Sequence, residues 1–275
     1  MDDLVMESVS LWWLAYPLLG AVVSVIAGMF GVGGGLVLVP ILYMLFTAQH
    51  FPHEHIMHMA LGTTMMSMIV TVAVSMNVHR KLGNVDWTIA RVMAVGLALG
   101  SIAGSTIASH LPTRPLTLIF SGIVMLAAVN MISNFKPAPT RQLPRTHWQL
   151  IVSFFFGIVA ALTAATGGFI VTPYLAWHNV PMKRAIGTTS AIGVPVAIGG
   201  ALSYFISGWS TPNLPPLTYG FVHLPALIGI VCCSSLGASW GARLISRWDG
   251  DKAKRVFGGY LLIIALKMLH SVLAA

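Results

Sequence analysis

Two glycine clusters in apolar sequence carry the residue types that could bind a negative group. They lie in GMFGVGGGLVLVP (28–40) and ATGGFIVTP (165–173). Glycines interrupt a helix, and the helix that resumes after the break begins with backbone N–H groups that have no intrahelical acceptor. Such an end carries a partial positive charge and binds anions without a buried ionised side chain. The candidate backbone donors are Gly33, Gly34, Gly35, Gly167 and Gly168, with Thr166 beside the second set.

A second repeated motif, Gly-Thr-Thr, follows each glycine cluster and supplies hydroxyl groups. A hydroxyl can donate to a sulfonate or carboxylate oxygen without the free-energy cost of burying a charge. The alternative is a bond back to a carbonyl of the preceding helical turn, which is frequent for Ser and Thr in membrane helices. The candidate hydroxyl donors are Thr63, Thr64, Thr188, Thr189 and Ser190.

The composition places these motifs in a membrane. The chain has 275 residues, of which 56% are hydrophobic and 8% charged, and its mean hydropathy is +0.83. A soluble domain carries about 25% charged residues. We therefore predict an all-α polytopic membrane protein. The net charge of +8 comes from basic residues between apolar blocks, which favours a role in topology over nucleic-acid binding.

The chain contains an internal duplication. The glycine clusters, their prolines Pro40 and Pro173, the Gly-Thr-Thr motifs and later glycines recur in the same order. Each half reads as five apolar segments, the second of which is too short to cross a membrane alone. The predicted units are a first transmembrane repeat over 10–134, a cytoplasmic linker over 135–146 and a second transmembrane repeat over 147–272. Close helix packing at small residues is the alternative for each cluster, but it requires no proline at the same place twice.

The basic residues predict an orientation. If every segment reverses the chain, all of the 15 Lys and Arg except Arg114 and Lys267 fall on one side. That side is then cytoplasmic, and both termini lie outside. Five segments per half make the second repeat enter from the opposite face, so the duplication is predicted to be inverted, with each repeat starting in a Gly-broken helical hairpin. Paired interrupted segments of this kind mark the binding sites of transporters.

The positions of the carboxylates and histidines restrict the class of substrate. All seven Asp and Glu lie in predicted termini or loops, which disfavours a metal cation as substrate. The loop QHFPHEHIMH gathers histidines, but its spacing is loose and no thiolate joins it, so we assign no metal and no cofactor. An intramembrane enzyme would need a nucleophile or metal motif, and neither a Ser/His/Asp arrangement nor H-E-x-x-H is present.

With these motifs in place, the sequence resembles the TauE/SafE sulfite exporter family over about residues 15–270. The resemblance is carried by GMFGVGGGLVLVP, ALGTT, HRKLGNVDW and SIAGSTIASHLP in the first half and by ATGGFIVTP, RAIGTTSAIG and GASWGARLISR in the second. In the second cluster, Ala164, Ala165 and Thr166 stand opposite Gly31, Val32 and Gly33, which departs from the pattern of the first.

The resemblance implies a bacterial inner-membrane transporter of small sulfur-containing anions, such as sulfite or sulfoacetate, that works outward by alternating access. Open alternatives are an uptake carrier or passive channel for another small anion, and an intramembrane enzyme. The expected partners are the anion and membrane lipid, and stripes of small residues would suit a homodimer.

Overall fold

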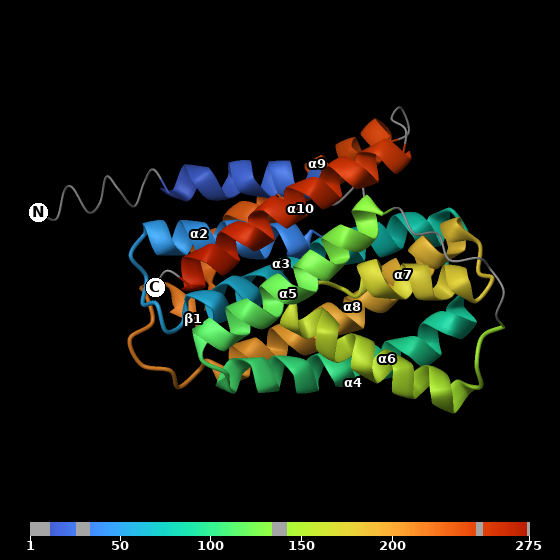
Figure 1. Cartoon of the computed structure of the whole chain (residues 1–275), viewed down its shortest axis with the longest axis horizontal. Helices are drawn as coiled ribbons and strands as arrows, with labels where there is room; N and C mark the ends of the chain where they lie inside the picture. The colour runs from blue at the N-terminus through green and yellow to red at the C-terminus, as the bar shows by residue number, and fades with distance from the viewer. Residues whose placement is uncertain (1–11, 26–33, 134–141, 246–249, 274–275) are drawn as a thin grey trace, which may run out of the picture.

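The chain is a bundle of helices with one short β-hairpin. The computed structural model describes residues 12–25, 34–133, 142–245 and 250–273 (Figure 1). The first helix covers Trp12–Val25. The further elements are α2 (Gly35–Ala48), α3 (Ile56–Lys81), α4 (Trp87–His110), α5 (Thr113–Ile132), α6 (Thr146–Leu162), α7 (Gly168–Trp177), α8 (Met182–Ser207), β1 (Thr218–Tyr219), β2 (Val222–His223), α9 (Leu224–Ile245) and α10 (Gly250–Leu273).

The helices confirm a polytopic all-α membrane protein. Five described helices are long and apolar enough to cross a membrane, namely α3, α4, α5, α8 and the part of α10 from Arg255 to Val272. Large apolar side chains cover the outside of the bundle. Leu126 is 73% exposed and Ile263 is 68% exposed. Such a surface suits hydrocarbon, because lipid tails are as apolar as these side chains.

The short helices form two hairpins that lie at opposite ends of the bundle. The first helix and α2 run beside each other in the left half of Figure 1, whereas α7 turns back from α6 into the right half. With 14 and 10 residues, α2 and α7 span only about 21 and 15 Å. Each hairpin therefore ends inside the bundle. This arrangement fits the predicted inversion of the repeats, which stays a prediction as far as the membrane itself is concerned.

The two ends of the bundle differ in charge. The end on the right of Figure 1 carries the connections from α3 to α4 and from α7 to α8. We call it the basic end, and its Lys and Arg residues with described side chains are Arg80, Lys81, Arg91, Arg145, Lys183, Arg184 and Arg255. The opposite end carries β1 and β2 and is called the hairpin end. Arg114 and Lys267 are the described Lys and Arg residues in the helices near it.

Stripes of small residues bring helices close together within the chain. A Cβ atom built on Gly100 would overlap the carbonyl oxygen of Phe154 in α6, and one on Gly104 would lie 2.8 Å from the Cα of Ile158. In the second half, a Cβ on Gly237 would overlap the hydroxyl of Ser24 in the first helix. These stripes are thus contacts between helices of one chain. The homodimer stays a prediction and does not gain support from them.

The close contact at Gly100 generates a stability prediction. Alanine is favoured over glycine in a helix by about 1 kcal/mol, but only where there is room for its methyl group. Gly122 in α5 has no described atom within 4 Å of an added Cβ, whereas Gly100 does. We expect Gly100→Ala to lower the midpoint of thermal unfolding in detergent and Gly122→Ala to leave it unchanged or raise it. Equal effects of the two substitutions would contradict this packing.

Candidate functional site

Both glycine clusters adopt the same local structure. Gly34 precedes α2 with φ +69° and Gly167 precedes α7 with φ +78°, a left-handed conformation that glycine adopts without steric cost. The carbonyl oxygen of Gly34 accepts from the N–H of Val37 at 3.1 Å, and that of Gly167 accepts from Ile170 at 3.0 Å. The duplication seen in the sequence is therefore also a duplication of backbone geometry.

The start of each short helix has free donors. Because Val37 and Ile170 are the first intrahelical donors, the N–H groups of the two preceding residues in each helix have no intrahelical acceptor. Among the described residues, no side chain caps either end and no acidic residue lies in either first turn. Pro40 and Pro173 occupy the sixth position of α2 and α7. Each proline lacks an N–H, so it also leaves a first-turn carbonyl without its usual donor.

The two breaks lie against each other. A Cβ built on Gly35 would overlap the carbonyl oxygen of Ala164, just before the second break, and would lie 3.2 Å from the sulfur of Met68 in α3. Thr166 packs on α8, since its Cβ lies 2.9 Å from the position of a Cβ on Gly193. The structure thus brings together the predicted residues Gly34, Gly35, Thr166, Gly167 and Gly168. Gly33 lies outside the described residues.

This meeting point is closed in the observed conformation. Gly35, Gly167 and Gly168 are buried, Gly34 is half-buried, and Thr166 is 4% exposed. The partial charges of the two helix ends are therefore shielded from bulk water, which strengthens their attraction for an anion. An anion would reach them only after helices move apart.

The first threonine of each Gly-Thr-Thr motif holds a loop from the other half of the chain. Thr63 Oγ1 accepts from the backbone N–H of His223 at 3.0 Å, and Thr188 Oγ1 accepts from that of Asp86 at 3.0 Å. The glycine before each threonine permits this approach. A Cβ on Gly62 would overlap the carbonyl oxygen of Phe221, and one on Gly187 would overlap that of Asn84. These reciprocal contacts close both ends of the bundle.

The remaining predicted hydroxyls behave differently from one another. Thr189 donates to the carbonyl of Ala185 at 2.7 Å and Ser190 donates to that of Ile186 at 3.0 Å, as the back-bonding alternative expects. Thr64 is fully buried, and its Oγ1 has no hydrogen-bond partner within the described part of the chain. A buried hydroxyl without a partner costs about 1–3 kcal/mol. Thr64 is therefore the candidate with a free hydrogen-bonding group to offer.

Two further hydroxyls join this region, and the sequence reasoning missed them. Ser75 Oγ donates to Ser190 Oγ at 3.3 Å, and Thr172 Oγ1 donates to Thr189 Oγ1 at 3.3 Å. Thr172 lies inside the second glycine motif, beside Pro173, so the sequence could have indicated it as a candidate. No sequence motif indicates Ser75, because it contacts Ser190 only through the packing of α3 on α8.

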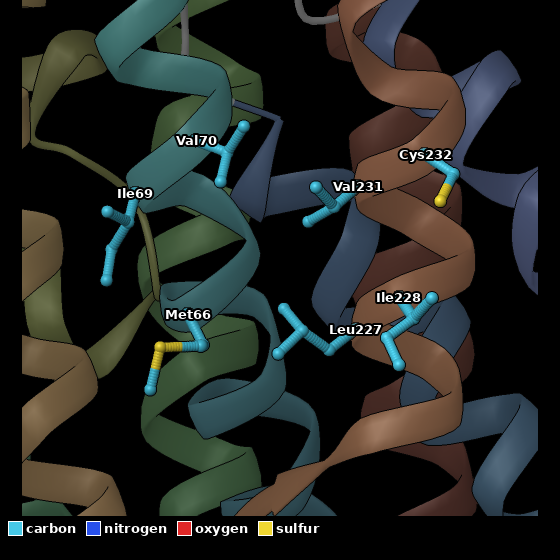
Figure 2. A pocket seen from close by; sticks show the side chains of 7 residues that line it. All are labelled: Met66, Ile69, Val70, Leu227, Ile228, Val231 and Cys232. Carbon is cyan, nitrogen blue, oxygen red and sulfur yellow. The ribbon is translucent and has the colours of Figure 1, made fainter.

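An apolar groove of about 360 Å³ between α3 and α9 is unsuited to an anion. Figure 2 shows Val70 of α3 and Leu227 and Val231 of α9 directed into the space between the two helices. The groove is lined by Met66, Ile69, Val70, Leu227, Ile228, Val231 and Cys232, with no charged side chain. Cys232 and Cys233 are both free thiols.

The histidines of the hairpin end pack with aromatic rings. His58 Nε2 lies 2.9 Å from the carbonyl oxygen of Leu111, and its ring centroid lies 5.0 Å from that of Phe221. Within the described ranges, no three His, Cys, Asp or Glu side chains converge as a metal site would require. His223 is 5% exposed and packs against Tyr16, Phe46 and Phe51.

The burial of His223 makes stability depend on pH. Desolvation lowers the pKa of His223 from 6.5 to about 4. Between these values the unfolded chain binds a proton at this histidine that the folded chain does not bind. The contribution of His223 to the free energy of unfolding is therefore fully present above pH 6.5 and is lost as the pH falls toward 4. We expect a loss of roughly 3 kcal/mol from this group, measured by unfolding in detergent. His223→Phe should remove that part of the slope, whereas His147→Gln, at an exposed site on α6, should not. An unchanged slope in His223→Phe would contradict the assignment.

The family model and the similar proteins agree on one family of membrane proteins. The model of the family described as sulfite exporter TauE/SafE matches residues 16–268. A probable membrane transporter protein of Haemophilus influenzae is 29% identical over 252 residues, which cover 91% of this chain and 96% of the relative. The probable membrane transporter protein YdhB of Bacillus subtilis is 25% identical over 230 residues, or 80% and 85% of the two chains. A probable membrane transporter protein of Methanocaldococcus jannaschii is 25% identical over 235 residues, or 82% and 85%.

No solved structure matches the chain significantly. The family match extends over nearly all of the sequence and includes both glycine breaks, both Gly-Thr-Thr motifs and the loops that they hold. This chain belongs to the sulfite exporter TauE/SafE family.

Proposed function

We propose that the protein transports small sulfur-containing anions, such as sulfite or sulfoacetate, outward across the inner membrane of a bacterium. The observation that carries this proposal is the contact of Gly35, at the uncapped start of α2, with Ala164, four residues before the uncapped start of α7. Each helix start carries a partial charge of roughly +0.5, and both lie in the low-dielectric interior of the bundle. A small anion would compensate both ends at once.

The family supports the class of substrate, because its description names sulfite export. The names of the relatives describe membrane transporters and no enzyme. In our proposal, the backbone N–H groups of both breaks bind the oxygens of the anion and Thr64 donates its hydroxyl. Thr63 and Thr188 then act at the ends of the bundle, where they hold the loops that have to move.

We further propose an orientation and a movement. The basic end faces the cytoplasm, because Lys and Arg are enriched in cytoplasmic loops. Both termini then lie outside. The repeats, residues 10–134 and 147–272, rock against each other around the two breaks, so that the anion is exposed to one side at a time.

Thr64 provides a sharp test of the site. We expect Thr64→Val to weaken the apparent affinity for sulfoacetate in proteoliposome flux about tenfold or more, because a hydrogen bond to a charged group contributes about 1.5–3 kcal/mol. The same substitution should not lower thermal stability, since it removes a buried hydroxyl that has no described partner.

Ser121 in α5 is the matched control for Thr64. Its hydroxyl is also buried without a partner among the described residues, but the glycine breaks involve α2, α3, α7 and α8 rather than α5. Ser121→Ala should leave both affinity and stability unchanged. If Thr64→Val bound sulfoacetate with wild-type affinity, Thr64 would not be part of the binding site.

A ligand panel tests the substrate class. A ligand that binds only the folded state raises the unfolding temperature with its concentration. We expect sulfite or sulfoacetate to stabilise the purified protein more than acetate, taurine or sulfate. Stabilisation by non-sulfur ligands alone would overturn the substrate class while leaving the architecture intact. Saturable flux with counterflow would separate a carrier from a passive channel.

A further inference from the structure

The contact between α3 and α8 consists of two halves that occupy equivalent positions in the duplication. Gly62 corresponds to Gly187, an offset of 125 residues, which pairs Ser75 with Gly200 and Ser190 with Met65. Toward the basic end, Ser75 and Ser190 contact each other through their hydroxyls at 3.3 Å. Toward the hairpin end, a Cβ on Gly200 would lie 3.1 Å from Cε of Met65. The contact of α3 with α8 therefore occurs twice, through two hydroxyls toward the basic end and through Met65 toward the hairpin end, where the hydroxyl of Ser101 in α4 also lies 2.8 Å from the Cβ position of Gly200.

The short helices repeat this difference. Gly34 corresponds to Gly167, an offset of 133 residues, which pairs Thr172 in α7 with Val39 in α2. Thr172 donates to Thr189 at 3.3 Å. Val39 has no hydroxyl for Thr64, the equivalent of Thr189, and Thr64 Oγ1 has no partner within the described residues. Among these equivalent pairs, hydroxyl–hydroxyl contacts thus occur toward the basic end.

Burial follows the same division. Ser75, Thr172 and Ser190 are half-buried, whereas Val39 and Met65 are both 0% exposed. At the hairpin end, the loop before α9 covers the seam, with Phe221 3% exposed and the N–H of His223 bonded to Thr63. The seam is therefore less fully covered toward the basic end than toward the hairpin end.

The hydroxyls lead to the breaks. Ser190 lies less than one helical turn before Gly193, and Ser75 lies less than one turn after Val72. Both Gly193 and Val72 border Thr166, because a Cβ on Gly193 would lie 2.8 Å from Val72 and 2.9 Å from Thr166. A continuous series of side chains thus connects the basic end with the second break.

We propose that Ser75, Thr172 and Ser190 line the path by which the anion passes between the basic end and the glycine breaks. This proposal rests on the proposed function, and it assigns a role to Ser75 and Thr172. Each hydroxyl can give its hydrogen to a passing sulfonate or sulfite oxygen instead of to its neighbour. The equivalent outer positions lack this property, so the proposed path leads from the breaks to the basic end and opens when the helices move apart.

Cysteine labelling tests the path without requiring transport. Both native cysteines are first replaced by serine. The single variants Thr172→Cys and Ser190→Cys then measure the rate of thiol modification on the proposed path. Val39→Cys and Met65→Cys measure the same rate at the equivalent apolar positions. The probe is a membrane-impermeant thiosulfonate that carries a sulfonate group. We expect the first pair to react about tenfold faster or more, because thiol modification depends on access. The reaction should proceed in vesicles that expose the basic end.

The outcomes separate the path from the transport proposal. Equal rates at equivalent positions, or faster reaction at Val39→Cys and Met65→Cys, would overturn the path. Unequal rates in a protein that shows no flux of sulfur anions would support the path and overturn the proposed function. Unfolding curves of each variant establish that the compared proteins are folded.

A second variant tests the path if a cysteine variant does not fold. Ser75→Met introduces beside Ser190 the bulky apolar side chain that Gly200 meets at the equivalent outer contact. We expect Ser75→Met to lose most of the sulfoacetate flux, while Ser75→Ala, which fills no additional space, retains it. Wild-type flux in folded Ser75→Met would overturn the path.

Discussion

The structure depends on a backbone constraint. A bilayer interior contains no water, so each N–H and C=O group there needs a partner within the protein. Two helices in this chain nevertheless begin inside the bundle at Gly34 and Gly167, and no described side chain caps them. The two helix starts also repel each other weakly, because both are positive ends. In the proposed function, an oxyanion would satisfy the donors and remove the repulsion.

The duplication determines how these ends are held together. Neither repeat closes its own end of the bundle. The Gly-Thr-Thr motif of the first half binds the loop at His223, and that of the second half binds the loop at Asp86. Any rocking of one half against the other has to break or bend one of these contacts.

The two copies have diverged where the chemistry of the two sides differs. Ser75 and Ser190 occupy positions whose equivalents are Gly200 and Met65, so α3 and α8 contact each other through two hydroxyls on one side of the crossing and through the Met65 side chain on the other. A buried apolar contact also seals more firmly against water than a pair of hydroxyls does. The two copies share the positions of these contacts but differ in the side chains that make them.

The sequence alone determined the class of protein, the ten helices of the described residues and the positions of both breaks. These properties depend on local composition and on motifs such as the glycine clusters and Pro40 and Pro173. Glycine and proline interrupt a helix through their own backbone conformation, whatever packs against them. The resemblance in those motifs was also sufficient to identify the family.

The tertiary structure decided which groups meet. It placed Gly35 against Ala164, more than a hundred residues away in the chain, and turned the stripe at Gly100 toward α6. It also separated the five predicted hydroxyls into loop holders, back-bonded groups and the unpartnered Thr64. Such pairings depend on the distance between helices, and no local pattern in a single sequence encodes that distance.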